Sequence, residues 1–559
     1  MFYSKITSIS FNNGQSLDIK PNDIVIFVGP NNSGKSQSLR DIYSLIGGAT
    51  ETVVVNDATL TKGDKTELIH EISEISVTYN NSNSRSIQYK GYNYDIVGWQ
   101  FDSYETEKML HSSIRNYLFS FLRTEDRLSI SNPPNAIDSS DQKTHPIHYL
   151  LFDKEYQKKV SQFFNEAFGF ELTPDYVSRK KVSLCMGTTP QLSSGAAPTV
   201  MDQLEKILLS YPKVHEQGDG MRSFAGIVLH LILRNYGVFL IDEPESFLHP
   251  PQAKILGKVI GELLDSDRQA FIATHSEDII KGLIEQCPER IKVIRITRKR
   301  NINQFAVLDN EQFTKIWDDP LLKHSNIMSS LFHKNVVLCE SDADCRFYSI
   351  ILDYLKSQEG HFSETLFVHC GGKQRMKHVV NALRSLSIDF RCVPDIDVLN
   401  DKNTIKCLFE ACGGTWDAEM DSRYIRFSSN LNGGNESISK QELRSRIDRL
   451  LDGFSADKLT SSDLKKIAAD LKLETKWSAL KSGGMAMIPA GQAKTAFNEI
   501  NKAFHAVNLF VVPVGELERF VTEEGGHGPI WVNNVLDNHK DLSGDVYKAA
   551  REFVSLWKL

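Results

Sequence analysis

The sequence lacks the features of a secreted or membrane protein. Its eight cysteines are scattered along the chain and none forms a Cys-x-x-Cys pair, which predicts reduced and mostly buried thiols. The longest apolar run, near "FAGIVLHLIL", is interrupted by His230 and is much shorter than the roughly 20 residues that span a bilayer. The N-terminus, "MFYSKITSIS", has no charged-then-apolar signal pattern. We therefore expect a cytoplasmic protein with no membrane partner.

The chain also lacks a positive net charge, since 64 Lys and Arg against 71 Asp and Glu give a formal value of -7. A nucleic-acid partner would therefore need a local basic surface. The densest basic stretch is residues 290–301, followed by 178–182 and the mixed run 439–449. Such basic runs are usually solvated surfaces. For residues 290–301, contact with DNA is the alternative interpretation. Neither a helix-turn-helix nor a base-stacking pattern is present, so sequence-specific recognition is not predicted.

The 559 residues exceed the usual size of one domain, and short apolar strands alternate with helical patterns in both halves. We therefore predict an α/β protein of two domains. The first is expected at residues 1–325, with an inserted helical segment at about 105–210, and the second at 326–559, with a helical insertion at about 402–506. Finer expectations are a β meander at 67–99, a helix at 107–123, a linker at 317–330 and strand character at 508–520.

The stretch "GPNNSGKS" follows an apolar strand and precedes a helical pattern, and it matches G-x-x-x-x-G-K-[ST]. Such a turn exposes several backbone N–H groups to one phosphate, and glycines permit the close approach. Lys35 adds a mobile positive charge, and Ser36 offers a hydroxyl to Mg²⁺. A glycine-rich turn with a chance lysine would not explain the strand before it and the helix after it. We predict an ATP site at Gly29, Asn31, Asn32, Ser33, Gly34, Lys35 and Ser36.

A second motif supplies carboxylates for the same site. The apolar run "VFLI" ends in Asp242 and Glu243, so a buried strand delivers both acids to its carboxyl end. Asp242 would hold Mg²⁺ through water, and Glu243 would polarise the attacking water. The following Pro244 also permits a simpler interpretation, in which the acids only cap a helix. The two motifs together favour an ATPase.

Four further acids follow short apolar strands in the second half. Glu340 and Asp344 come after "VVLC", and Asp395 and Asp397 come after "RCVP". Carboxylates gathered at one sheet edge repel each other unless cations neutralise them, and hard oxygen ligands suit Mg²⁺ or Mn²⁺. A metal-assisted attack on a phosphodiester is the chemistry that such a cluster serves. The competing interpretation is that the acids are loop residues and helix caps.

The ATPase motifs resemble those of ABC-type ATPases of the SMC and RecF kind. The resemblance implies that His275, in "FIATHSED", senses the γ-phosphate, and that the signature motif is "EQGDGMRSF", which contains Gly218 and Gly220. That stretch lacks the usual serine-glycine-glycine form, whereas "LSSGA" at 192–196 is closer in form but too far upstream. The resemblance also implies a homodimer or higher homo-oligomer that sandwiches ATP, with a dimerisation role for the segment at about 105–210. Gln100 is the candidate for a metal-contacting or water-contacting glutamine.

The acidic half resembles a Toprim domain through Glu340, "HCGGK" and Asp395-Ile396-Asp397. An ABC-type ATPase followed by Toprim resembles the OLD (overcoming lysogenization defect) family of nucleases. The resemblance implies that Glu340 is a general acid/base or metal ligand and that Asp344, Asp395 and Asp397 are metal ligands. It adds Glu516 as a late ligand, with Glu518 as the alternative. It also implies Lys548, or else Lys540, as the lysine that steadies the transition-state phosphate, and a tight turn at Gly371 and Gly372.

The combined motifs lead to one principal hypothesis: an ATP-regulated, Mg²⁺- or Mn²⁺-dependent DNA endonuclease. The family resemblance alone adds a role in antiphage defence, as in Gabija-type and retron-associated effectors, with a partner protein or a retron RNA/DNA. The alternative is a RecF-like or SMC-like DNA-binding ATPase sensor whose Toprim fold binds only metal or a partner. A primase-like or topoisomerase-like enzyme is a weaker third interpretation, because the sequence has no strand-passing tyrosine module.

Overall fold

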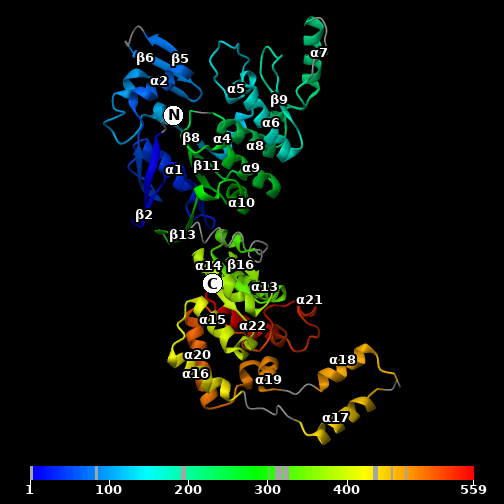
Figure 1. Cartoon of the computed structure of the whole chain (residues 1–559). Coiled ribbons are helices and arrows are strands. Elements are labelled where there is room, and N and C mark those ends of the chain that lie inside the picture. Colours follow the sequence, from blue (N-terminus) through cyan, green and yellow to red (C-terminus); the bar gives the residue numbers. More distant parts are fainter. Residues whose placement is uncertain are drawn as a thin grey trace. The chain divides into compact units, whose positions relative to one another are not determined.

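The computed structural model describes residues 4–81, 86–190, 197–233, 235–300, 302–308, 319, 326–431, 438–454, 458–471 and 475–559. It divides into two compact units, Met1–Lys315 and Ile316–Leu559 (Figure 1). Most of the expected linker at 317–330 lies outside the described residues, and its last part enters the short helix η4 (Met328–Phe332). No helix of the described residues is long and apolar enough to cross a membrane.

A six-stranded sheet forms the centre of the N-terminal unit, in the order β14-β13-β3-β12-β11-β8. Every neighbouring pair is parallel except β13 with the edge strand β14. Strands β3, β11 and β12 are apolar runs buried along their whole length, as expected where helices cover both faces of a parallel sheet. The strands are β3 (Ile24–Val28), β8 (Phe119–Leu122), β11 (Val238–Asp242), β12 (Gln269–Ala273), β13 (Ile291–Lys299) and β14 (Ile302–Val307).

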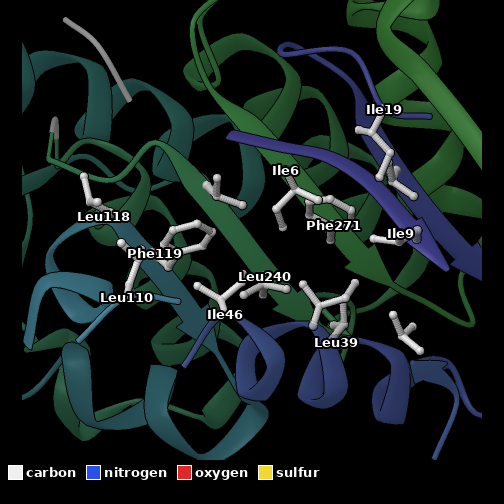
Figure 2. Packing of buried hydrophobic residues seen from close by; sticks show 14 of the residues in the cluster. Ile6, Ile9, Ile19, Leu39, Ile46, Leu110, Leu118, Phe119, Leu240 and Phe271 are labelled. Carbon is white, nitrogen blue, oxygen red and sulfur yellow. The ribbon is translucent and has the colours of Figure 1, made fainter. Parts of the chain in front are cut away.

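A hydrophobic cluster fixes the helix that follows the phosphate loop, α1 (Lys35–Ile46). It joins α1 to the central sheet and to a smaller antiparallel sheet of β2 (Ser16–Asp18), β1 (Lys5–Phe11) and β4 (Val55–Thr61). Because α1 begins directly at the loop, this packing also fixes the loop. Figure 2 shows the contributing side chains, which include Ile6, Ile9, Leu39, Ile46, Leu240 and Phe271.

The remaining helices of this unit complete its α/β architecture. The central ones are α8 (Asp219–Leu231), α9 (Pro250–Leu263) and α10 (Glu277–Gln286). The stretch before them contains α4 (Thr124–Ile130), α5 (Pro146–Phe152), α6 (Lys154–Phe168) and α7 (Ala197–Ser210), with a hairpin of β9 (Leu172–Pro174) and β10 (Leu184–Met186). The short helices are η1 (Gly98–Phe101), η2 (Val214–Glu216) and η3 (Pro288–Arg290).

Two sequence expectations in this unit are wrong in part. The expected meander at 67–99 begins with a helix, α2 (Lys65–Ile75), because Asp64 caps it and Leu68 and Ile72 are buried one turn apart. Strands β5 (Val77–Asn81), β6 (Ser86–Gly91) and β7 (Tyr94–Val97) then form the meander. The expected helix at 107–123 ends as α3 (Ser112–Leu118), and β8 follows at once as an edge strand of the central sheet. The inserted segment is therefore not wholly helical.

A parallel three-stranded sheet, in the order β16-β15-β17, is the centre of the C-terminal unit. Its strands are β15 (Asn335–Cys339), β16 (Thr365–His369) and β17 (Asp389–Val393), and α13 (Asp342–Gln358) and α14 (Lys373–Ser385) connect them. The expected strand at 508–520 is instead an irregular segment that runs along β17. Backbone hydrogen bonds join Phe510 N to Cys392 O (2.8 Å) and Val512 N to Pro394 O (3.0 Å). This segment brings Glu516 to the edge of the sheet.

The described residues of the insertion expected at about 402–506 form helices joined by short loops, with no strand among them. After η5 (Ile396–Asn400), they form α15 (Lys402–Cys412), α16 (Ala418–Ser429), α17 (Lys440–Asp452), α18 (Ser461–Asp470), α19 (Lys476–Gly483), η6 (Gly484–Met487) and α20 (Gln492–Ala506). The chain ends in η7 (Leu517–Phe520), α21 (Pro529–Asn538), η8 (Asp545–Tyr547) and α22 (Lys548–Ser555). An aromatic cluster of Phe347, Tyr348, Phe520, Trp531, Phe553 and Trp557 joins α13 to these last elements.

Replacement of Trp531 by alanine should destabilise the C-terminal unit by about 3–5 kcal/mol, the usual cost of deleting a buried aromatic side chain. Trp531 is 0% exposed. Its neighbour on α21, Ile530, is 66% exposed, so Ile530→Ala should change stability by no more than about 0.5 kcal/mol. Urea denaturation followed by circular dichroism measures both variants. Equal midpoints would contradict the packing described here.

Candidate nucleotide and metal sites

The glycines of the phosphate loop are required by its backbone. Gly29 has φ 145°, and a Cβ atom there would lie 2.0 Å from the carbonyl oxygen of Ile296. Gly34 has φ 106° and caps α1. Lys35 Nζ donates to the carbonyl oxygens of Gly29 (2.9 Å) and Pro30 (2.8 Å). Burial lowers the pKa of Lys35 to about 8, although nearby carboxylates act in the opposite direction. The loop is thus curled around its lysine, with its N–H groups at the start of a helix.

Asp242 and Glu243 lie at the carboxyl end of β11, next to this loop. Arg127 holds their backbone, donating to the carbonyl oxygens of Asp242 and Glu243 at 2.8 Å each. Burial raises the pKa of Asp242, and a hydrogen bond with Ser36 acts in the opposite direction. Asp242 Oδ1 is buried and has no hydrogen-bond partner among the described residues. A buried unpaired carboxylate oxygen beside a serine hydroxyl fits Mg²⁺, so Ser36 and Asp242 would hold the ion.

Glu245 places His275 beside Glu243. Its carboxylate accepts hydrogen bonds from Thr274 Oγ1 (2.8 Å) and from the backbone N–H of His275 (2.6 Å). Burial lowers the pKa of His275, and its Nε2 lies 3.9 Å from Glu243 Oε1. The imidazole and the candidate water-polarising carboxylate therefore face the same space.

That space is a cavity of about 560 Å³, and eight of the predicted residues line it. The sequence motifs did not indicate Arg40, Val53, Val54, Arg298 and Asn303, which also line it. The predicted residues that do not line it are Gly29, Gln100, Gly218, Gly220 and Asp242. Gly218 caps α8, and Gln100 hydrogen-bonds to Val97 N and His111. The predicted residues that line the cavity are Asn31, Asn32, Ser33, Gly34, Lys35, Ser36, Glu243 and His275.

The densest basic stretch is partly buried, although Arg298 and Arg300 are exposed. Residues 291–299 are strand β13, and Arg290 and Arg295 are buried, with 8% and 4% of their surface exposed. Arg290 donates to backbone carbonyls, including Arg268 O at 2.8 Å. Arg298 lines the nucleotide cavity. Arg290 and Arg295 are therefore part of the folded interior, and Arg298 is part of the nucleotide cavity.

In the C-terminal unit, Glu340 and Asp395 meet at the ends of β15 and β17. Glu340 Oε1 accepts a hydrogen bond from Asp395 N at 3.1 Å. Burial and the negative charge of Asp397 raise the pKa of Glu340 to about 7. Burial and the charge of Glu340 raise the pKa of Asp395 well above its usual range.

A glycine turn lies beside this site. The backbone N–H groups of Gly371 and Gly372 donate to Glu340 O at 3.0 and 3.1 Å, and the two glycines have φ angles of 70° and 123°. The predicted tight turn is therefore present beside the site.

Asp344 caps a helix and also borders the acidic cavity. It lies in the first turn of α13, and its Oδ2 accepts a hydrogen bond from Ser341 N at 2.8 Å, which completes a capping box. Burial raises its pKa. It nevertheless lines the same cavity as Glu340. The carboxylate is therefore fixed as a helix cap while one side of it borders the acidic site.

A cavity of about 590 Å³ brings these acids together. Glu516 and Glu518 both line it, but they have different partners. Glu518 Oε1 accepts from Gly528 N (2.8 Å) and lies 2.6 Å from His527 Nδ1, whereas Glu516 lies near Lys481 (3.5 Å) and Arg519 (3.6 Å). The predicted residues that line the cavity are Glu340, Asp344, Gly371, Gly372, Asp395, Asp397, Glu516 and Glu518.

Two lysines to which the sequence analysis assigned no role enter this site, although Lys373 ends the "HCGGK" motif. Lys373 Nζ lies 2.9 Å from Asp397 Oδ1. Lys481, from α19, lies 3.7 Å from Asp397 Oδ2 and lines the cavity. Partial burial acts to lower the pKa of Lys481, but the charges of Asp397 and Glu516 outweigh it and raise the pKa. Lys548 is exposed at the start of α22, and neither it nor Lys540 lines the cavity.

The oxygen ligands of this cavity suit a divalent cation. Among the described residues, no group of three or more His, Cys, Asp or Glu side chains is already arranged to hold a metal ion. Mg²⁺ does not require one, because it usually keeps several waters and binds one or two carboxylates together with substrate phosphates. Burial and mutual repulsion raise the pKa of Glu340 and Asp395, and a bound cation would favour their ionised forms. Asp395, Asp397 and Glu516 would hold it, with Glu340 beside them.

Two family models match this chain. The model described as "AAA domain, putative AbiEii toxin, Type IV TA system" matches residues 196–281, which contain Asp242, Glu243 and His275. The model described as "Overcoming lysogenization defect protein-like, TOPRIM domain" matches residues 331–397, which contain Glu340, Asp344, Asp395 and Asp397. No curated protein matches the chain.

Solved structures of ATPase heads are similar to the chain at low identity. An SMC head bound to the C-terminal winged-helix domain of ScpA is 11% identical, with a TM-score of 0.34 over 56% of this chain and 99% of that one. The SMC head domain from Thermotoga maritima is 10% identical, with a TM-score of 0.29 over 55% and 99%. A nucleotide-free ATP-binding cassette from an ABC transporter is 14% identical, with a TM-score of 0.26 over 58% and 98%. The domain assignment therefore depends on the family models and on the geometry.

Lys35→Ala should weaken the binding of a non-hydrolysable ATP analogue by about 10-fold or more, because charge-assisted hydrogen bonds contribute about 1.5–3 kcal/mol. Isothermal titration calorimetry measures the affinity. Lys154→Ala is the control, since Lys154 is an exposed helical lysine of the same unit. Equal affinity of Lys35→Ala and the control would contradict the nucleotide site.

Proposed function

We propose that this chain, which carries the two domains of an OLD-family ATPase–Toprim protein, is an ATP-regulated, divalent-metal-dependent DNA endonuclease. The observation that carries the proposal is the meeting of Glu340, Asp395, Asp397 and Glu516 in one cavity of the Toprim unit. A scaffold gains nothing from crowding carboxylates that raise one another's pKa. Perturbed carboxylates in a cleft are typical of catalytic sites.

Glu340 is the residue best suited to move a proton in this cavity. Burial and the charge of Asp397 bring its pKa to about 7, which is near the optimum for a general acid or base at neutral pH. The N–H of Asp395 orients the carboxylate. A divalent cation, when bound, would supply activation of water and stabilisation of the leaving oxygen. Asp395, Asp397 and Glu516 provide the oxygens that would hold it.

The ATPase unit supplies the regulation in this proposal. In it, the phosphate loop and Lys35 bind the triphosphate, and Glu243 orients the attacking water. His275 lines the same cavity and lies next to Glu243. Gly218 and Gly220 lie outside the cavity. The resemblance to ABC-type ATPases, in which two chains sandwich ATP, is the reason for proposing a homodimer. A role in antiphage defence, with a partner protein or a retron RNA/DNA, follows from the family resemblance.

One observation favours a second candidate function, a DNA-binding ATPase sensor that does not cut. Lys373 and Lys481 both lie next to Asp397, so two ammonium groups already neutralise part of the acidic cluster. Such pairing would stabilise the fold without a metal. Asp395 has no comparable ion pair among the described side chains, so the two lysines leave its carboxylate for a metal ion to neutralise.

Asp395→Ala should abolish plasmid nicking while ATPase activity stays within about two-fold of wild type, because the two activities use different cavities. Loss of a group that acts in the transition state costs roughly 100-fold or more in rate. The assay uses Mg²⁺ or Mn²⁺, with and without ATP. Asp389→Ala is the matched control, since Asp389 lies at the opposite end of β17 with a 57% exposed side chain. A wild-type protein that nicks under none of these conditions would favour the non-cutting sensor.

A further inference from the structure

One side chain of the helical insertion, that of Lys481, lines the acidic cavity. We propose that Lys481 binds the phosphate of the DNA strand in the Toprim cavity, an inference that rests on the nuclease function proposed above. Lys481 is near the end of α19, about 80 residues after Asp397 in the sequence. Among the described residues that line the cavity, it is the only lysine.

The backbone of α19 is locked to the loop that carries Glu516. A Cβ atom on Gly515 would lie 2.1 Å from Lys481 O, and one on Gly484 would lie 2.2 Å from Pro513 O. Both glycines have positive φ, at 112° and 63°, so both the space and the backbone require glycine. Met485 N donates to Pro513 O at 2.8 Å. The position of Lys481 relative to Glu516 is therefore set by main-chain contact.

The two lysines beside Asp397 are held differently. Lys373 makes close contacts with Asp397, at 2.9 Å to Oδ1 and 3.2 Å to the carbonyl oxygen. Lys481 lies 3.7 Å from Asp397 Oδ2 and 3.5 Å from Glu516 Oε2, beyond the usual 2.7–3.2 Å of an N–H···O hydrogen bond. Its side chain is 46% exposed. Lys373 thus fixes Asp397, whereas the ammonium of Lys481 is reachable from solvent and has donors available for an incoming oxygen.

The charge of the site favours phosphate at this place. Asp397 and Glu516 repel a phosphodiester unless positive charge stands between them and it, and Lys481 lies between these two acids. Hydrolysis forms a bond from a water oxygen to phosphorus and breaks the bond to the leaving strand end, which takes up the proton that the water loses. Lys481 keeps its protons throughout and donates to a non-bridging oxygen, where negative charge grows in the transition state.

Lys481→Ala should slow nicking by about 100-fold, the usual cost of removing one donor to a developing oxyanion, with ATPase activity unchanged. Lys481→Arg should retain part of the activity, because it keeps the charge. Lys476→Ala is the matched control, since Lys476 is on the same helix, donates to Asn430 O at 3.0 Å and does not line the cavity. A wild type that nicks and a Lys481→Ala variant that nicks equally well would overturn the inference while leaving the proposed nuclease intact.

Two binding measurements decide the matter without cleavage. With Ca²⁺ in place of Mg²⁺, Lys481→Ala should bind a fluorescent DNA duplex more weakly, and the salt dependence of binding should fall by about one phosphate contact. Its affinity for Mn²⁺ in calorimetry should stay the same or rise, because a competing cation has been removed. Weakened Mn²⁺ binding would show that Lys481 only positions the acids and would overturn the inference. Unchanged DNA binding would also overturn it, whether or not the wild type cuts.

Discussion

Side chains that follow neighbouring parallel strands meet at one edge of the sheet, and both sites of this chain depend on that constraint. In the N-terminal unit, β3, β11 and β12 end in the phosphate loop, the Asp242–Glu243 pair and the Thr274–His275 pair. In the C-terminal unit, β15 and β17 end in Glu340 and Asp395. In each unit, segments that are distant in the sequence therefore line one common cavity. The helices between the strands bring the chain back to the same edge of the sheet.

The two cavities use this edge with opposite charge. In the nucleotide cavity, Lys35 donates to two backbone carbonyls of the phosphate loop, and its ammonium would meet a bound phosphate. The Toprim cavity concentrates carboxylates, and burial with mutual repulsion raises the pKa of Glu340 and Asp395. Lys373 and Lys481 offset part of that repulsion. Perturbed carboxylates of this kind are typical of functional sites.

Residues that follow a strand directly could be predicted, because their spacing and their strand appear together in the sequence. This holds for the phosphate loop, Asp242, Glu340, Asp395 and Asp397. Helix α2 could not be predicted, because a short run such as "ISEIS" satisfies both the strand and the helix period. Strand β8 could not be predicted either, because its four residues follow directly after a helix. Lys481 could not be found, because its place depends on backbone contacts among Gly484, Pro513 and Gly515. The local sequence around Gly484 and Gly515 does not indicate which backbone atoms these glycines contact.

The central claim is that the Toprim carboxylates form a metal-dependent site for DNA. Anomalous scattering from Mn²⁺, in crystals of the full chain with a short DNA duplex, tests it most directly. The account predicts Mn²⁺ beside Asp395, Asp397 and Glu516, with a DNA phosphate between the ion and Lys481. Mn²⁺ found only beside Ser36 and Asp242, with DNA bound elsewhere, would contradict it.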